Sequence, residues 1–355
     1  MKRRYDIDWI RDITVLSIIF YHSLIIFFTR ESAVMFVRSG VDLPFCIYTE
    51  AIMSRICMPL LFLLAGYSAK YSLEKRTVKE FILNRVKKLL LPFLIVSFTL
   101  NPVVSYIYGI TQGRDITFSQ HMFKFVTSIS ENFEGRTTGY SPMHLWFLLF
   151  FFVFSLVCAP AFAKCNHPIR QEKMAGFFQK PGMLLLFVIP YPFIFLIEIM
   201  DEMNPLAYLY LFLVGYVFAT SEKYQQVLDR DKWLYTVLAV VTIGVSLYSW
   251  FWYQGSGSYL LAYCVKAARI LSPFAIIGLG HSYIKSKNSR LLNYLNQANF
   301  FIYLIHMLVL TAVGYVVLQF SVNPIIQFIV INLASYGICF GIFEIYRRGR
   351  QKYKK

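Results

Sequence analysis

Long apolar runs separated by short polar segments dominate the chain. A helix that crosses the hydrocarbon core of a bilayer needs about 20 mostly apolar residues, and this criterion predicts ten spans. They cover residues 9–28, 46–69, 89–110, 144–163, 183–200, 205–220, 233–253, 259–280, 300–320 and 324–346. Only residues 201–204 separate the fifth and sixth spans, so a tight helical hairpin is an alternative there. The pattern predicts an all-α, polytopic membrane helix bundle that forms one domain over residues 1–355.

The composition excludes most other classes of protein. Of the 355 residues, 57% are hydrophobic and only 15% are charged, whereas a soluble domain carries about 25% charged residues. A soluble enzyme, a disordered chain and a disulfide scaffold are therefore excluded. The six cysteines form no C-x-x-C pair and most lie in apolar runs. They are expected to pack as small apolar side chains, and no metal site is expected.

Lysine and arginine are unevenly distributed over the predicted loops, which sets the orientation by the positive-inside rule. With the N-terminus in the cytoplasm, the inner segments hold 26 of the 35 basic residues, the outer segments 5 and the spans 4. Both termini are therefore expected to be cytoplasmic. Basic loops facing anionic lipid then explain the net charge of +16, and nucleic acid is not an expected partner.

Residues 70–88 form a basic segment ahead of the third span. Apolar Val78 and Phe81 recur at helical spacing beneath a basic face, which is typical of a cytoplasmic amphipathic helix. Arg85 and Lys88 are three residues apart and would lie together on that helix. The segment has two interpretations: attraction to anionic lipid headgroups, or docking of a polyphosphorylated cytosolic ligand.

Arg11 and His22 share the first predicted span. Eleven residues turn a helix only about 20° past three full turns, so the two side chains lie on one face, about 16 Å apart along the axis. Ionisable residues inside a span are functional candidates by default. The alternatives are snorkelling of Arg11 or its pairing with Asp8, and a hydrogen-bonded packing role for His22.

The eighth span carries Lys266 and Arg269, which lie three residues apart on one face. Two cations inside a bundle need an anionic partner or a water-filled cavity. They could bind phosphate or carboxylate groups, or they could form a buried pair with Glu50 or Glu198. His306 lies about 9 Å into the ninth predicted span, and alone it is expected to be a packing residue.

Five blocks of sequence carry a resemblance to a known family. They are Asp8–Arg11 followed after ten residues by His22, then Met58–Tyr67, Asn84–Phe93, His144–Leu148 and Tyr303–His306. In order and spacing they resemble the acyltransferase-3 family of integral membrane acyltransferases, in its glucan-modifying protein C-like branch. Lys88 stands where the R-x-x-R motif of that family has its second arginine, and lysine keeps the charge without the bidentate fork.

The resemblance implies a membrane O-acetyl- or O-succinyltransferase of the bacterial cytoplasmic (inner) membrane. Such an enzyme moves an acyl group, commonly acetyl, from cytosolic acyl-coenzyme A to a hydroxyl of an extracytoplasmic glycan. His22 is then the general base or an acyl relay, and Arg11 orients the donor. Arg85 and Lys88 bind donor phosphates. Acetyl- or succinyl-coenzyme A is a co-substrate, no bound cofactor is expected, and the envelope polysaccharide machinery is a candidate partner.

Under the same resemblance, Lys266 and Arg269 contribute to donor binding. They stabilise charge along the transfer path or bind the carboxylate of a succinyl donor. Four further residues have secondary roles: Asp8, Tyr303, His306 and His144. Of these, His144 would position the acceptor.

Two other classes of function are considered. A transporter of an anionic solute or lipid-linked saccharide would suit buried cations, but transporters often show two similar halves and this sequence has none. A structural subunit of an envelope complex would leave costly buried charges without a role.

Overall fold

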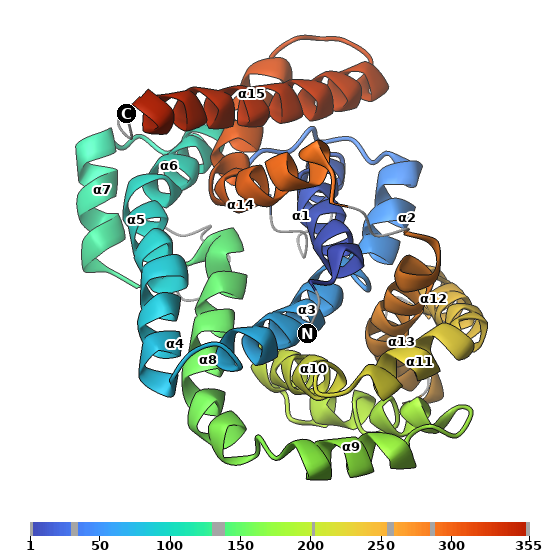
Figure 1. The fold of residues 1–355 in the computed structure, drawn as a ribbon. Helices are drawn as coiled ribbons and strands as arrows, with labels where there is room; N and C mark the ends of the chain where they lie inside the picture. The colour runs from blue at the N-terminus through green and yellow to red at the C-terminus, as the bar shows by residue number, and fades with distance from the viewer. Residues whose placement is uncertain are drawn as a thin grey trace. The chain divides into compact units, whose positions relative to one another are not determined.

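The fold is entirely helical in the computed structural model of the chain (Figure 1), which describes residues 3–29, 35–129, 139–200, 203–253, 259–284 and 288–352. Within these residues, eight helices or joined helices are long and apolar enough to cross a membrane. The number is nine if the bent pair α10 (Pro205–Phe218) and α11 (Glu222–Arg230) counts as one span. The predicted class of polytopic helical membrane protein is confirmed, with eight or nine candidate spans instead of ten.

The helices belong to two compact units. Unit 1 comprises residues 1–14, 51–86 and 150–289, and unit 2 comprises residues 15–50, 87–149 and 290–355. Elements that contribute residues to both units are α1 (Tyr5–Ile26), α2 (Pro44–Met53), the π-helical turn η1 (Val86–Leu90) and α8 (Trp146–Lys164).

Each unit has its own set of further helices. Unit 1 also holds α3 (Cys57–Leu73), α4 (Val78–Arg85), α9 (Pro168–Phe177), the 3₁₀ segments η3 (Met183–Phe187) and η4 (Pro192–Leu196), α10, α11, α12 (Lys232–Tyr253) and α13 (Tyr259–Tyr283). Unit 2 also holds α5 (Leu91–Thr99), α6 (Asn101–Thr111), α7 (Phe118–Thr127), the 3₁₀ turn η2 (Met143–Leu145), α14 (Arg290–Val317) and α15 (Pro324–Lys352).

In unit 1, helices α3 and α10 pack with their backbones in contact. A Cβ atom at Gly66 would overlap the carbonyl oxygen of Phe212, and one at Gly215 would overlap the carbonyl oxygen of Leu63. Small residues at such crossings allow the close approach that drives helix association in a bilayer. Gly66 lies in the second sequence block, Met58–Tyr67, so that block contributes a packing contact to the fold.

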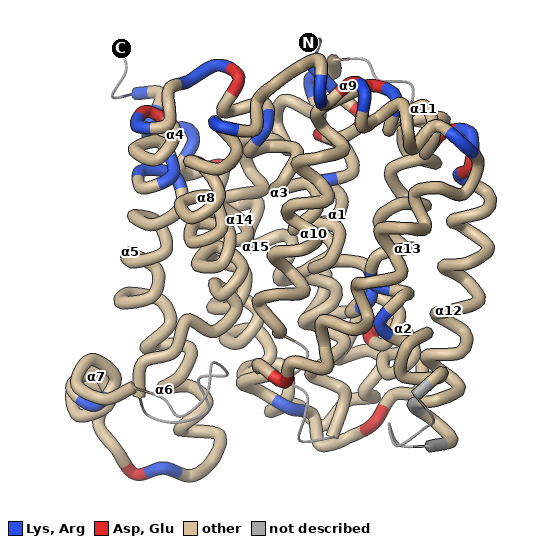
Figure 2. Tube along the Cα trace, turned by 90° about the horizontal axis from the view of Figure 1, so that it is seen from below, with Lys and Arg blue, Asp and Glu red and all other residues tan. Residues whose placement is uncertain are grey.

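Many of the basic residues of unit 1 gather at one end of its helices. Figure 2 shows them on α4, α9 and α11, at the same end as the start of the chain. At this end Asp231 accepts hydrogen bonds from the backbone N–H of Gly182 (2.9 Å) and from Nε of Arg230 (2.7 Å). The hydrogen bond from the Arg230 side chain lowers the pKa of the Asp231 carboxyl below its ordinary value.

The prediction of a fifth span over residues 183–200 is wrong. The chain there forms the short segments η3 and η4 in place of one spanning helix. Pro190 and Pro192 have no backbone N–H and cannot donate to an α-helical ladder. Residues 201–202, between the fifth and sixth expected spans, lie outside the described residues.

The expected sixth span, residues 205–220, is shorter than predicted and bent. Helix α10 has 14 residues, and the axis turns by 104° into α11. The turn occurs where Ser221 caps the new helix, because its hydroxyl accepts a hydrogen bond from the backbone N–H of Lys223 (3.2 Å). The geometry is that of a broken span or a re-entrant loop.

The basic segment 70–88 is divided between two helices. Its first residues end α3, and α4 begins after a capping box in which Thr77 and Glu80 exchange hydrogen bonds. Helix α4 then runs through η1 and α5 into α6, and Val78–Thr111 together form one candidate span. The third span therefore begins about a dozen residues before the predicted position, at 78 instead of 89.

Helix α14 also begins earlier than expected, at Arg290 instead of residue 300. The polar residues there continue the helix because Asn296 donates to the carbonyl of Leu292 (2.8 Å) and Gln297 donates to that of Asn293 (3.1 Å). His306 therefore lies 16 residues after the helix begins, about 24 Å along the axis. The expected depth of about 9 Å for His306 is corrected accordingly.

Replacing Gly66 with Ala should destabilise unit 1, because the added methyl group meets backbone that cannot move aside. Overpacking of this kind costs roughly 1–3 kcal/mol. Gly244→Ala is the matched control, since no atom lies within 4 Å of a Cβ at that helical position, and alanine is the better helix former. Thermal unfolding in detergent should show a lower midpoint for Gly66→Ala only; equal midpoints for the two variants would contradict the packing argument.

Candidate functional site

Three histidine rings from distant parts of the chain meet in unit 2. His22 lies on α1, His144 in the turn η2 and His306 on α14. The rings of His22 and His306 are stacked, with centroids 5.4 Å apart and an interplanar angle of 30°. The ring of His144 meets that of His306 edge to face at 4.9 Å. The structure therefore joins three histidines that the sequence analysis treated separately.

The orientation of His306 is fixed by its own helix. Its Nδ1 lies 2.7 Å from the carbonyl oxygen of Tyr303, one turn earlier. A carbonyl can only accept, so Nδ1 carries the proton and Nε2 is the unprotonated nitrogen of the neutral ring. The hydroxyl of Tyr303 in turn donates to the carbonyl of His144 (2.7 Å). Tyr303 thus connects α14 to the turn that carries the third histidine.

The turn that carries His144 is held from several sides. The side-chain amide of Asn101 on α6 donates to the carbonyls of Ser141 (3.4 Å) and Pro142 (3.2 Å). The Ser141 hydroxyl accepts from the backbone N–H of Met143 (3.1 Å), and Met143 has a positive φ of 49°. A bulky residue seldom adopts this conformation, and such strain persists only where the surroundings over-determine it.

Helix α15 orients the part of α1 that presents His22. Asn332 donates to the hydroxyl of Ser23 (2.6 Å), and the hydroxyl of Tyr336 donates to the carbonyl of Leu16 (2.7 Å). These bonds lie on both sides of His22 in the sequence. They fix the rotation of α1 about its axis, and with it the direction of the imidazole.

Four imidazole nitrogens of this cluster are buried and lack a hydrogen-bond partner among the described residues. They are Nδ1 of His22, both ring nitrogens of His144 and Nε2 of His306. His306 is 1% exposed. A neutral imidazole can accept a proton from a hydroxyl near neutral pH. The cluster can therefore perform general-base chemistry.

In unit 1, Arg85 is a buried cation without a counter-ion among the described residues. Its guanidinium carbon lies 4.7 Å from the ring centroids of both Phe81 and Phe151. Its Nε and Nη2 have no hydrogen-bond partner in the part of the chain that the structure describes. These N–H groups suit an anionic group such as a phosphate.

Lys266 and Arg269 share an aromatic neighbour in unit 1. Both lie over the ring of Phe195, at 4.4 Å and 5.5 Å from its centroid. Arg269 also donates to the hydroxyl of Tyr208 (2.6 Å). Tyr208 was not among the predicted residues. An anion-binding role for the two cations stays a prediction.

Arg11 forms the ion pair that the sequence analysis gave as the alternative to a functional role. Its Nη2 lies 3.1 Å from a carboxylate oxygen of Asp8 and 3.3 Å from one of Asp12, while 40% of its side chain is exposed. Lys88, in η1, is exposed, whereas Arg85 is buried. The two members of the R-x-x-R-like motif therefore differ in their access to solvent.

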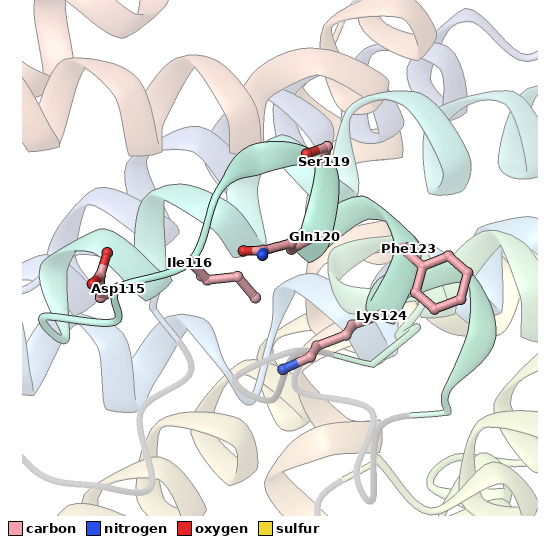
Figure 3. A pocket seen from close by; sticks show the side chains of 6 residues that line it. All are labelled: Asp115, Ile116, Ser119, Gln120, Phe123 and Lys124. Carbon is pink, nitrogen blue, oxygen red and sulfur yellow. The ribbon is translucent and has the colours of Figure 1, made fainter.

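A cavity of about 490 Å³ lies in unit 2 at the start of α7 (Figure 3). Its lining comes from α7 and the loop before it and consists of Asp115, Ile116, Ser119, Gln120, Phe123 and Lys124. No residue of the histidine cluster lines this cavity. Among the described residues, no group of three or more His, Cys, Asp and Glu side chains has the geometry to hold a metal ion.

Comparison with known proteins gives one match. A family model described as an acyltransferase domain matches residues 4–344 of the chain. This range includes all five sequence blocks and the three histidines. No curated protein and no solved structure matches the chain.

Replacing Arg85 with Met should leave the thermal stability unchanged or raise it. The desolvation of a buried, unpaired charge costs several kcal/mol, which exceeds two cation–π contacts of about 1–2 kcal/mol each. The matched control is Arg4→Met, because Arg4 donates to Asp6 (2.6 Å), a residue that is 1% exposed. Removing Arg4 leaves the buried carboxylate of Asp6 unpaired and should lower the free energy of unfolding by about 3–5 kcal/mol.

Melting curves of both variants in detergent test this contrast. A loss of stability in Arg85→Met as large as that in Arg4→Met would mean that Arg85 stabilises the fold. Its guanidinium would then not be an unpaired charge that is kept for a ligand.

Proposed function

The chain belongs to the acyltransferase-3 family and is a multi-pass membrane acyltransferase, and from this premise we propose that it is an O-acyltransferase acting across a bacterial cytoplasmic membrane. The donor is acyl-coenzyme A, with acetyl as the first candidate acyl group and succinyl as the second. The acceptor is a hydroxyl of an extracytoplasmic carbohydrate or glycan, which the envelope polysaccharide machinery supplies.

The observation that carries the proposal is the stacked pair of His22 and His306 in unit 2. One ring has an unpartnered Nδ1 and the other an unpartnered Nε2 among the described residues. His22 takes the proton of the acceptor hydroxyl while the hydroxyl oxygen attacks the thioester carbonyl. The carbon–sulfur bond then breaks, and the proton passes to the departing thiolate, which leaves as free coenzyme A.

His306 and His144 support His22 in this proposal. The hydrogen bond from Nδ1 of His306 to its own helix fixes which nitrogen faces the cluster. The ring of His144 lies edge to face with that of His306 at 4.9 Å, and His144 is a candidate to position the acceptor. An acyl relay through His22 and direct attack by the acceptor both fit this arrangement.

The cations of unit 1 and η1 serve the donor. Arg85, with two unpartnered nitrogens among the described residues, binds a donor phosphate, and exposed Lys88 adds a second positive charge. Arg11, held by Asp8, orients the donor. Lys266 and Arg269 stabilise charge along the path or bind the carboxylate of a succinyl group.

His22→Ala should lower the release of coenzyme A from acetyl-coenzyme A by about 100-fold or more, since a general base contributes 10²–10⁴ in rate. The measurement uses purified protein in nanodiscs with a glycan acceptor and a thiol-reactive dye. His121→Ala is the matched control. His121 is fully buried in α7 of the same unit, where its ring lies between Tyr106 and Phe125.

Three results of that experiment separate the alternatives. Unchanged turnover in His22→Ala would remove His22 from the mechanism. Radiolabel retained on the wild-type protein would favour the acyl relay over direct attack. Failure of both acetyl- and succinyl-coenzyme A to bind would favour the transporter that the sequence analysis considered.

Tyr303→Phe removes a single hydroxyl and leaves the carbonyl of His144 without its donor. We expect a loss of about 1–3 kcal/mol in stability and a fall of roughly tenfold in turnover, which corresponds to 1.4 kcal/mol. Tyr210→Phe is the control, because it removes a similar bond to the carbonyl of Phe187 (2.9 Å) in unit 1. A similar loss of turnover in both variants would show that only general stability matters.

A further inference from the structure

Asn299 on α14 is buried without using its side-chain amide. It is 4% exposed, and neither its Nδ2 nor its Oδ1 has a hydrogen-bond partner among the described residues. Leaving buried donors and acceptors unpaired is costly. The neighbouring amides behave differently, because Asn296 and Gln297 both donate to carbonyls of their own helix. Unlike these two amides, Asn299 keeps a donor and an acceptor that have no partner among the described residues and that a bound group can satisfy.

The amide lies on the same face of α14 as the histidine cluster. Asn299, Tyr303 and His306 are spaced i, i+4 and i+7, so they form one stripe along the helix. Asn299 and His306 are about 10 Å apart along the axis. The hydroxyl of Tyr303 and Nδ1 of His306 already have partners. The unpartnered polar atoms of this stripe, among the described residues, are the amide of Asn299 and Nε2 of His306.

Asn299 also lies between the histidine cluster and the basic end of unit 2. Helices α14 and α15 lie side by side (Figure 1), and the start of α14 packs against the end of α15. There the ring of Tyr294 stacks with that of Phe340 (6.3 Å), and the guanidinium of Arg347 lies over Tyr294 (5.4 Å). Glu344 pairs with both Arg347 (2.8 Å) and Arg348 (3.0 Å), and the last turns of α15 add two further basic residues, Arg350 and Lys352.

The order along unit 2 is therefore basic end, unpartnered amide and histidine cluster. A ligand that fits this order has phosphates at one end, amide groups in the middle and a reactive acyl group at the other end. The phosphopantetheine arm of an acyl thioester has this layout, since two amide groups in series separate its phosphates from its sulfur. A side-chain amide pairs with such a group by donating and accepting at once.

We propose that Asn299 binds an amide of the pantetheine arm and so positions the thioester at the histidine cluster; this proposal rests on the proposed use of acyl-coenzyme A. Asn299 is a positioning residue that does not touch the reacting atoms. It makes the protein selective for donors whose acyl group is carried on an amide-containing arm.

The test compares Asn299→Leu with wild type on three donors: acetyl-coenzyme A, S-acetylpantetheine and ethyl thioacetate, which has no amide. We expect KM to rise about 10- to 100-fold for the first two, as the loss of about 1.4–2.7 kcal/mol would give. The kcat/KM for ethyl thioacetate should stay within about twofold. Gln297→Leu, which removes an exposed amide on the same helix, should leave all three donors unaffected.

Two results would overturn the proposal. One is an equal loss on all three donors, which would indicate a structural role or a buried water at Asn299. The other is no change with any donor. The melting midpoint of Asn299→Leu should not fall, because the variant removes an unpaired amide.

Direct binding of coenzyme A separates this proposal from the proposed function. A wild-type protein that binds coenzyme A more tightly than Asn299→Leu but transfers no acyl group would contradict the proposed O-acyl transfer and still support a pantetheine site at Asn299. If the wild-type protein transfers the acyl group and Asn299→Leu transfers it equally well, the proposed function is supported and the role of Asn299 is contradicted.

Discussion

The constraint on which this structure depends is that a polar group inside a bilayer must find its partner within the protein. In unit 2 this requirement fixes how the helices are rotated. The bonds from α15 to Ser23 and to the carbonyl of Leu16 set the face of α1, and the amide of Asn101 sets the turn before α8. These bonds hold the parts of the backbone that carry His22 and His144, and the bond from Nδ1 of His306 to the carbonyl of Tyr303 holds the third ring.

The same constraint makes the exceptions informative. A protein that satisfies most of its buried polar groups but leaves a few unpaired keeps those few at a cost in stability. Among the described residues they include nitrogens of the histidine cluster and the amide on one face of α14 in unit 2, and the guanidinium between two phenylalanine rings in unit 1, besides others such as the imidazole of His121 and the hydroxyl of Tyr224. The stability that is given up at these positions is available as binding energy for a ligand that supplies the missing partners.

The sequence predicted the class of fold well because apolar length alone decides it. It failed where length was not the controlling property. Residues 183–200 are apolar enough to span, but Pro190 and Pro192 prevent a continuous α-helix. The polar start of α14 was excluded from a span, although Asn296 and Gln297 satisfy their own amides on the helix backbone.

The site was predictable only in part. His22 stood out because an ionisable residue in a span is costly, but its contact with His306 and His144 depends on tertiary packing that no local pattern encodes. Asn299 and Tyr208 carry no charge, so the cost of burying an ionisable group in a span did not single them out. A count of every polar side chain at a buried helical position would have included both.

The distance in sequence between the three histidine rings has a consequence for biosynthesis. His306 is made 284 residues after His22. At about 5–20 residues per second, the ribosome needs roughly 15 to 60 s to add them. During that time α1 resides in the membrane without α15, so Ser23 and the face that presents His22 have neither the hydrogen bonds nor the packing of the finished protein. The histidine cluster and the bonds that orient it are therefore complete only after the last two helices, α14 and α15, have been made.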